Sequence, residues 1–148
     1  MKMLGRGLNL SMKIVALIGL IDALYLTWVK LSHQESACLP GIGNCATVNS
    51  SRYATIYGIP IAVLGAGAYL TILIVLSLEN RKGFWAENNG MIVFGLSLIG
   101  VLYSAYLTYL ELAVIHAICP FCVLSAVAIL SIFVINFVRL TKNQANSN

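Results

Sequence analysis

Two cysteines stand three positions apart, Cys119 and Cys122 in "CPFC", at the start of a long apolar run. Cysteines at this spacing can bind a metal ion, form a short disulfide or exchange disulfides with a partner thiol. The only other cysteines, Cys38 and Cys45, lie in "CLPGIGNC". Which chemistry applies depends on where the rest of the chain places these four side chains.

Three chemistries compete. Zinc is disfavoured because six residues separate Cys38 from Cys45, whereas zinc sites usually have two to four between paired ligands. A structural disulfide is a serious alternative for that pair, since the intervening proline and glycines can turn the chain. It is weak for Cys119 and Cys122, because closing so small a loop removes little entropy from the unfolded chain. Redox exchange is favoured for this second pair, because the positive end of a helix dipole favours a thiolate.

The composition indicates a membrane protein. Of 148 residues, 59% are hydrophobic and 9% are charged, whereas about a quarter of the residues in soluble domains are charged. The net charge of +4 is too small for a nucleic-acid-binding surface. Four apolar runs approach the roughly 20 residues that span a bilayer. We therefore expect one all-α domain, residues 1–148, folded as a four-transmembrane-helix bundle with helices at about 12–29, 56–78, 90–110 and 118–138.

The basic residues predict the orientation of these helices, because loops rich in Lys and Arg stay in the cytoplasm. Two basic residues, Lys30 and Arg52, fall on one side. Seven fall on the other side: Lys2, Arg6, Lys13, Arg81, Lys82, Arg139 and Lys142. Both termini are therefore expected in the cytoplasm. All four cysteines are expected on the outer side, with the first pair on an outer loop between helices 1 and 2, where disulfides persist.

The chain also contains an internal repeat. "LIGLIDALYLTWVKL", residues 17–31, matches "LIGVLYSAYLTYLEL", residues 98–112, at seven of fifteen positions with an offset of 81. Cys38 falls on Cys119 at the same offset. Chance similarity between apolar helices is the alternative explanation, but the fixed register favours two related helical hairpins. Small residues in both copies would let helices approach closely in lipid.

Taken together, these motifs resemble the vitamin K epoxide reductase family, specifically its bacterial members. The resemblance covers nearly the whole chain. It is carried by the outer-loop cysteines, by "CATVNSSRY" after them, by "YGIP", by "YLTYLEL" and by "CPFC". It implies a four-helix bundle around a quinone, ubiquinone or menaquinone, in the cytoplasmic (inner) membrane. It also implies oxidation of a secreted or periplasmic thioredoxin-like partner, in support of disulfide formation outside the cytoplasm.

The resemblance also implies roles for single residues. Cys119 and Cys122 correspond to the active-site pair, with Cys122 next to the quinone, and Cys38 and Cys45 to the shuttle pair. Ser51 corresponds to a serine that lines the quinone pocket, and no metal is implied. A tyrosine that contacts substrate in some members is replaced by Ala126 here, which favours an ordinary quinone over vitamin K epoxide.

Two further features bear on these expectations. Many bacterial members of the family carry a fused thioredoxin-like domain; because only the short polar tail "TKNQANSN" follows the last apolar run here, the partner is expected to be a separate protein. The rival function is a small four-helix membrane transporter with structural disulfides, which the internal repeat also fits.

Several other side chains carry expectations. Asp22 interrupts the first apolar run, and either it handles protons or it packs helices as a neutral or hydrogen-bonded carboxyl group. Glu111 is expected to be solvated at the outer interface. Gly58, Gly65 and Gly67 are expected to serve helix packing. An interfacial aromatic belt is predicted for Trp28, Tyr53, Tyr106 and Tyr109.

The orientation can be tested by labelling. A membrane-impermeant thiol reagent added to intact, reduced cells should modify Cys38 and Cys45, because both are predicted on the outer loop. The modified residues are identified by mass spectrometry. Modification that appears only after lysis would reverse the orientation and remove the argument for an oxidising environment.

Overall fold

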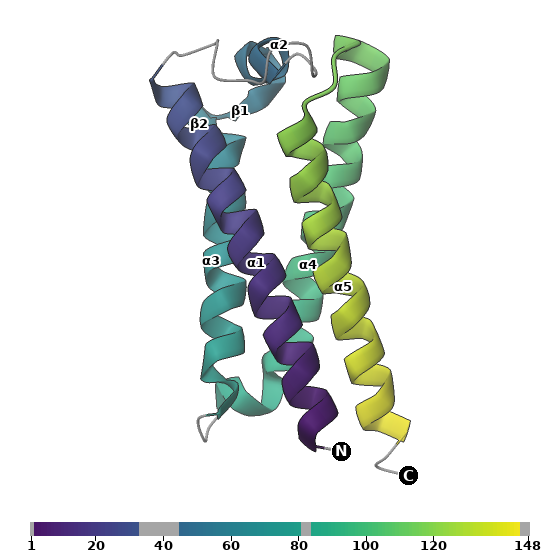
Figure 1. The fold of residues 1–148 in the computed structure, drawn as a ribbon. Helices are drawn as coiled ribbons and strands as arrows, with labels where there is room; N and C mark the ends of the chain where they lie inside the picture. Colours follow the sequence, from purple (N-terminus) through teal and green to yellow (C-terminus); the bar gives the residue numbers. More distant parts are fainter. Residues whose placement is uncertain (1, 33–44, 81–83, 146–148) are drawn as a thin grey trace.

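The structure is a computed structural model that describes residues 2–32, 45–80 and 84–145. It is almost entirely helical (Figure 1). The four long helices are α1 (Lys2–Leu31), α3 (Ile61–Ser77), α4 (Phe84–Leu110) and α5 (Pro120–Ala145). The shorter elements are the helix α2 (Cys45–Ser50), the 3₁₀ turns η2 (Arg52–Ala54) and η3 (Leu78–Asn80), the π-helical turn η4 (Glu111–Ile115), and the strands β1 (Thr55–Ile56) and β2 (Ile59–Pro60).

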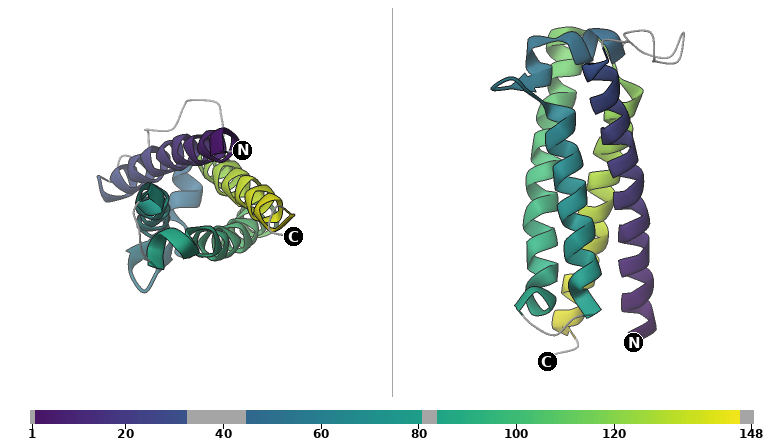
Figure 2. Two further views of the ribbon diagram at one scale, coloured as in Figure 1. Left: turned by 90° about the horizontal axis from the view of Figure 1, so that it is seen from below. Right: turned by 90° about the vertical axis from the view of Figure 1, so that its left-hand side faces the viewer.

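The long helices form a bundle in which α1 packs against α3 and α5, and α4 packs against the same two helices. Seen along its length, the bundle has one long helix at each corner of a quadrilateral (Figure 2). The start of α1 and the end of α5 lie at the same end of the bundle (Figure 1). The segment 45–60, called the cap below, lies at the opposite end. Which side of the membrane each end faces stays a prediction.

Three of the helices are long and apolar enough to cross a membrane: Arg6–Leu31, Asn88–Ile115 and Pro120–Lys142. The helix Ile61–Ser77 is also apolar but has 17 residues. The outward faces are apolar as well, since Leu17, Ile99 and Val127 are each at least half exposed. Such extended apolar surface is typical of a protein that contacts lipid or another apolar partner.

The core lies between the helices in the half of the bundle nearer the termini. Its fully buried side chains include Met12, Ile72, Leu76, Val93 and Ile132. Polar contacts join the helices at the same end. Arg139 of α5 forms an ion pair with Glu79, and the Asn136 side chain donates a hydrogen bond of 2.8 Å to the backbone oxygen of Gly90.

The second long helix begins later than the sequence predicts. The expected start was residue 56, but residues 55–60 form a two-stranded antiparallel hairpin in which Ile56 pairs with Ile59. Its two turn residues, Tyr57 and Gly58, have φ angles of 51° and 82°, as a tight hairpin turn requires. Gly58 therefore serves this turn, and the expectation that it packs helices was wrong. Pro60 is the last residue of the hairpin and directly precedes Ile61, the first residue of α3.

Two glycines that correspond in the internal repeat lie at close helix contacts. A Cβ atom on Gly19 of α1 would lie 2.4 Å from the ring of Tyr69 on α3, and one on Gly100 of α4 would lie 2.7 Å from Ile129 on α5. Each contact joins two long helices that pack against each other. The repeat therefore places a residue without a side chain at a close approach in both halves of the bundle.

We expect Gly19→Ala to destabilise the protein by about 1–3 kcal/mol, because the added methyl group displaces the ring of Tyr69. Thermal unfolding in detergent, followed by circular dichroism, measures the effect. Gly67→Ala is the matched control, since its Cβ would have no neighbour within 4 Å and alanine favours the helix. Equal melting temperatures for the two variants would contradict the packing argument.

Candidate active site

The two cysteines of "CPFC" lie where α5 begins. Cys119 directly precedes Pro120, the first residue of α5, and its carbonyl oxygen accepts a hydrogen bond of 3.1 Å from the backbone N–H of Val123. Cys122 lies within the first turn, where proline is tolerated because no helical partner exists for its missing N–H. Cys119 is 1% exposed and Cys122 is half-buried. The side chains of the two cysteines interact with each other.

A short turn connects the end of α4 to the cysteine pair. The α-helix widens into the π-helical turn η4, and His116 then adopts the left-handed conformation with φ 52°. The backbone oxygen of Glu111 accepts hydrogen bonds from His116 N–H and from Ala117 N–H, the latter at 3.1 Å. A left-handed residue other than glycine costs about 1 kcal/mol. This conformation occurs at the turn where the chain reverses direction into α5.

Glu111 is buried, so the expectation that it is solvated at the interface was wrong. It is 4% exposed, and its Oε2 atom accepts a hydrogen bond of 3.2 Å from the backbone N–H of Cys119. The same carboxyl group interacts with the side chain of Cys122. One acidic side chain therefore contacts both cysteines of the pair.

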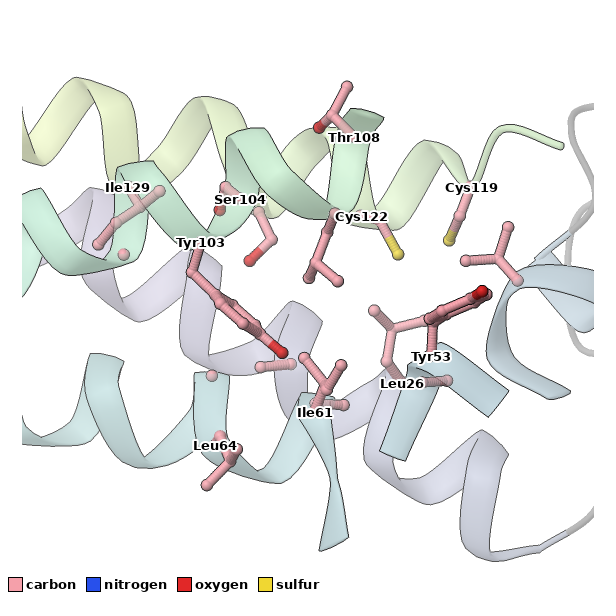
Figure 3. Close-up of a pocket in the computed structure, with 18 of the residues that line it drawn as sticks. Leu26, Tyr53, Ile61, Leu64, Tyr103, Ser104, Thr108, Cys119, Cys122 and Ile129 are labelled. Atoms are coloured by element: carbon pink, nitrogen blue, oxygen red, sulfur yellow. The ribbon is translucent and has the colours of Figure 1, made fainter. Parts of the chain in front are cut away.

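The cysteines face a cavity of about 370 Å³ inside the cap end of the bundle. Its walls come from all four long helices and from the cap (Figure 3). Figure 3 shows the sulfur atoms of Cys119 and Cys122 pointing into this space, and the side chain of Tyr103 extending across it from α4. Other lining side chains are Leu26, Tyr53, Ile61, Leu64, Ser104, Thr108 and Ile129. The walls are mostly apolar with a few polar groups, which is typical of a site for a small organic ligand.

Ser51 lines this cavity from the cap. Its hydroxyl group donates a hydrogen bond of 2.7 Å to the backbone oxygen of Val48. Although Ser51 directly precedes the 3₁₀ turn η2, its side chain does not form a capping hydrogen bond with that turn. The Ser51 hydroxyl therefore does not act as an N-cap of η2.

A second polar contact lies deeper in the cavity. Tyr69 of α3 donates a hydrogen bond of 2.7 Å to the backbone oxygen of Ser125 on α5, and its hydroxyl lies 3.1 Å from the Ser125 hydroxyl. Ser125 is one turn beyond Cys122 on the same helix, and both Tyr69 and Ser125 line the cavity. This contact fixes the distance between α3 and the part of α5 that carries the cysteine.

Apolar contacts hold the cap over the cysteines. Cys119 and Leu26 form a small buried cluster, and Val48 of α2 packs against it together with Phe121 and Cys122. The ring of Phe121 lies 5.1 Å from the ring of Tyr25 on α1, measured between centroids. The cap is thus placed directly against the start of α5.

The structure brings three of the predicted site residues together at one cavity: Cys119, Cys122 and Ser51. Cys38 lies outside the described residues. Cys45 is the first residue of α2, and its side chain also lies outside the described part. The helix that Cys45 begins contacts both η4 and the buried cluster around Cys119.

Some site residues were not anticipated from the sequence. Tyr53 was assigned to an interfacial belt, but it lines the cavity. Trp28, Tyr106 and Tyr109 are each more than half exposed, as a belt requires. Nothing in the sequence marks Tyr103 and Ser125 as site residues beyond their positions in apolar helices. Glu111 did have a signal in the sequence. It is an acidic residue eight positions before Cys119, which is close enough to lie in the turn that precedes the cysteine pair.

Asp22 is buried in the bundle at 6% exposure, and neither carboxyl oxygen has a hydrogen-bond partner among the described residues. It is not among the described residues that line the cavity. A carboxyl group without partners in an apolar interior is costly when charged, so the surroundings favour the neutral acid. Neither of the two roles weighed for Asp22 is decided by this position.

The fold and the site define a helical membrane protein with a cysteine pair beside an apolar cavity. Residues 10–137 match the sequence profile of the vitamin K epoxide reductase family, and the chain belongs to this family. It is also 30% identical over 120 residues to the thiol-disulfide oxidoreductase LTO1 of Arabidopsis thaliana. The match covers 77% of this chain and 32% of that relative, so this chain spans about a third of the length of the plant protein.

Proposed function

We propose that this protein is a membrane thiol–disulfide oxidoreductase that passes electrons from a secreted thioredoxin-like protein to a membrane quinone. The observation that carries the proposal is the place of Cys122, whose sulfur points into a mostly apolar cavity at the start of a helix. Family membership and the similarity to a thiol-disulfide oxidoreductase support it. The identity of the partner and the use of quinone are parts of the proposal.

The cavity fits a quinone ring. Its volume of about 370 Å³ lies in the range of small-molecule sites, and its apolar walls suit a ring that partitions into lipid. Ser51, Tyr53, Tyr103 and Ser104 line it with hydroxyl groups, which can hydrogen-bond ring oxygens. When bound, the quinone supplies a two-electron, two-proton acceptor.

The cysteines act in sequence. A thiolate of the outer pair, Cys45, attacks the sulfur of Cys119 in the inner disulfide, and the bond from Cys119 to Cys122 breaks. Cys38 then displaces Cys119 from the mixed disulfide, so the outer pair is oxidised and the inner pair holds two thiols. The outer pair is reduced again by the partner protein, which leaves as a disulfide. Reoxidation of the inner pair transfers two electrons and two protons to the quinone.

The closeness of α2 to the cluster around Cys119 supports an exchange between Cys45 and Cys119. The choice of Cys45 rather than Cys38 for this contact follows from the family resemblance. The hydroxyl of Ser51 is proposed to turn from the Val48 carbonyl and donate to a quinone oxygen. A donor fixed in a dry pocket stabilises the negative charge that develops there during reduction.

The relay predicts different effects for the two cysteine pairs. Cys119→Ala or Cys122→Ala should abolish quinone reduction by any thiol, because in the proposed relay electrons reach the quinone through the inner pair. Cys38→Ala or Cys45→Ala should block the protein partner yet spare a small dithiol that reaches Cys119 directly. Quinone absorbance in purified protein, with a reduced thioredoxin-like protein or with a small dithiol, measures both activities.

Equal loss in all four variants with the small dithiol would contradict the relay and favour structural disulfides. The intermediate provides a second check. Cys122→Ser lacks the thiol that would displace Cys45 from Cys119, so a disulfide between Cys45 and Cys119 should accumulate and be found by mass spectrometry. A disulfide between Cys38 and Cys119 alone would reverse the order of the outer pair.

The role of Ser51 predicts a selective loss of activity. Ser51→Ala should lower quinone-linked turnover by one to several factors of ten, each worth about 1.4 kcal/mol of transition-state stabilisation. Its melting temperature should change little, because one hydrogen bond to a backbone oxygen contributes about 1 kcal/mol. Steady-state turnover with a small dithiol and quinone gives the measurement.

The matched control for that experiment is Ser50→Ala. The hydroxyl of Ser50 is exposed and donates to the backbone oxygen of Thr47 at 3.3 Å, so this variant should keep nearly full turnover. Loss in Ser50→Ala with full activity in Ser51→Ala would mean that the wrong serine was assigned. Full activity in both would limit Ser51 to its hydrogen bond within the cap.

A further inference from the structure

Glu111 is a buried acid whose contacts all lead to the cysteine pair. Its backbone oxygen accepts two N–H groups of the turn that precedes α5. Its Oε2 atom accepts the backbone N–H of Cys119 at 3.2 Å, and its carboxyl group interacts with the side chain of Cys122. It also lines the cavity. Glu111 therefore accepts a hydrogen bond from the peptide that positions one sulfur, and it interacts with the cysteine that carries the other.

Positioning alone does not explain an acid at this place. Burying a carboxyl group costs several kcal/mol when it is charged, unless hydrogen bonds compensate. A glutamine would accept the same N–H of Cys119 through its side-chain oxygen, at a lower desolvation cost. What a carboxyl group adds to these hydrogen bonds is the ability to gain and lose a proton at a chemically useful pH.

The thiol chemistry of the pair creates a need for such a group. Thiolates are the attacking and leaving species in disulfide exchange, so Cys122 must lose a proton when it attacks and gain one when it leaves. Within the described residues, Cys119 and Glu111 are the ionisable groups that interact with Cys122. In a mostly apolar cavity a nearby acid replaces the water that would otherwise carry this proton.

We propose that Glu111 is the proton-transfer group of the Cys119–Cys122 pair. The inference rests on the redox function proposed above and names a residue that serves it. When an incoming thiolate attacks the sulfur of Cys119, the bond between Cys119 and Cys122 breaks, and Cys122 leaves with the bonding electron pair. The proton of the Glu111 carboxyl group moves to the Cys122 sulfur, so a mixed disulfide, a Cys122 thiol and a Glu111 carboxylate are formed.

The reverse step balances in the same way. The Glu111 carboxylate takes the proton of the Cys122 thiol while the Cys122 sulfur bonds to Cys119, and the attached thiolate leaves. The electrons stay on sulfur throughout, and Glu111 carries only the proton. General acid–base groups of this kind contribute about 10²–10⁴-fold to a rate.

The test uses exchange without quinone. The full chain carrying Cys38→Ala and Cys45→Ala is purified in detergent, freed of quinone and oxidised, so that only the inner disulfide can react. A small dithiol is added, and the rate at which Cys119 and Cys122 become available to an alkylating reagent is followed by mass spectrometry. Glu111→Gln, which keeps the acceptor for Cys119 N–H, should slow this rate about 100-fold at an unchanged melting temperature.

Glu79→Gln is the matched control. Glu79 is an acid at the opposite end of the bundle that pairs with Arg139, so this variant should keep the exchange rate of the parent protein. A Glu111→Gln protein that exchanges as fast as the parent would overturn the inference. A parent protein whose inner disulfide did not react with the dithiol would instead contradict the proposed function.

A third variant covers the case in which Glu111→Gln also lowers the melting temperature. Glu111→Asp keeps a carboxyl group but shortens the side chain, so it fits the turn less well than glutamine. A proton-transfer role requires the aspartate variant to exchange faster than the glutamine variant. A purely structural role gives the opposite order, and that order would overturn the inference.

Discussion

The site depends on how the backbone N–H groups between α4 and α5 find hydrogen-bond acceptors where water is scarce. A chain that reverses direction inside an apolar bundle leaves N–H groups without helical partners, and each costs free energy if it is buried alone. Glu111 supplies two acceptors. Its backbone oxygen accepts the N–H groups of His116 and Ala117, and its carboxyl group accepts the N–H group of Cys119. The position of the first cysteine therefore depends on the residue that begins the turn η4 after α4.

Close helix packing then sets the shape of the cavity. Gly19 admits the ring of Tyr69 between α1 and α3, and the hydroxyl of that ring reaches the backbone of Ser125 on α5. One tyrosine thus connects three helices at the wall of the cavity. Gly100 allows Ile129 to approach α4 in the other half of the bundle. Both contacts follow from the absence of a side chain at the repeated glycine.

The sequence predicted the helical bundle because long apolar runs have few alternatives in a membrane. It also placed Cys119 and Cys122 at the start of a helix, since proline and the apolar run fix that boundary. It failed where short polar and aromatic segments fold back. Most of the hairpin at 55–60 was predicted as the start of a transmembrane helix. Tyr53 and Glu111 were assigned to the membrane interface. The burial of Glu111 and the place of Tyr53 at the cavity depend on contacts between segments far apart in the chain, which local composition does not record.

The two ends of the bundle are held by interactions of different character. At the end near the termini, Asn136 and Arg139 join α5 to neighbouring segments through directional polar contacts. At the other end, the described hydrogen bonds of Ser51 and Ala54 remain within the cap, and the cap meets the helices through Val48 and an apolar cluster. Apolar contacts are non-directional, so small sliding movements of the cap leave these contacts largely intact. The bundle thus has directional polar contacts near the termini and adaptable apolar contacts between the cap and the start of α5, beside the reactive sulfurs.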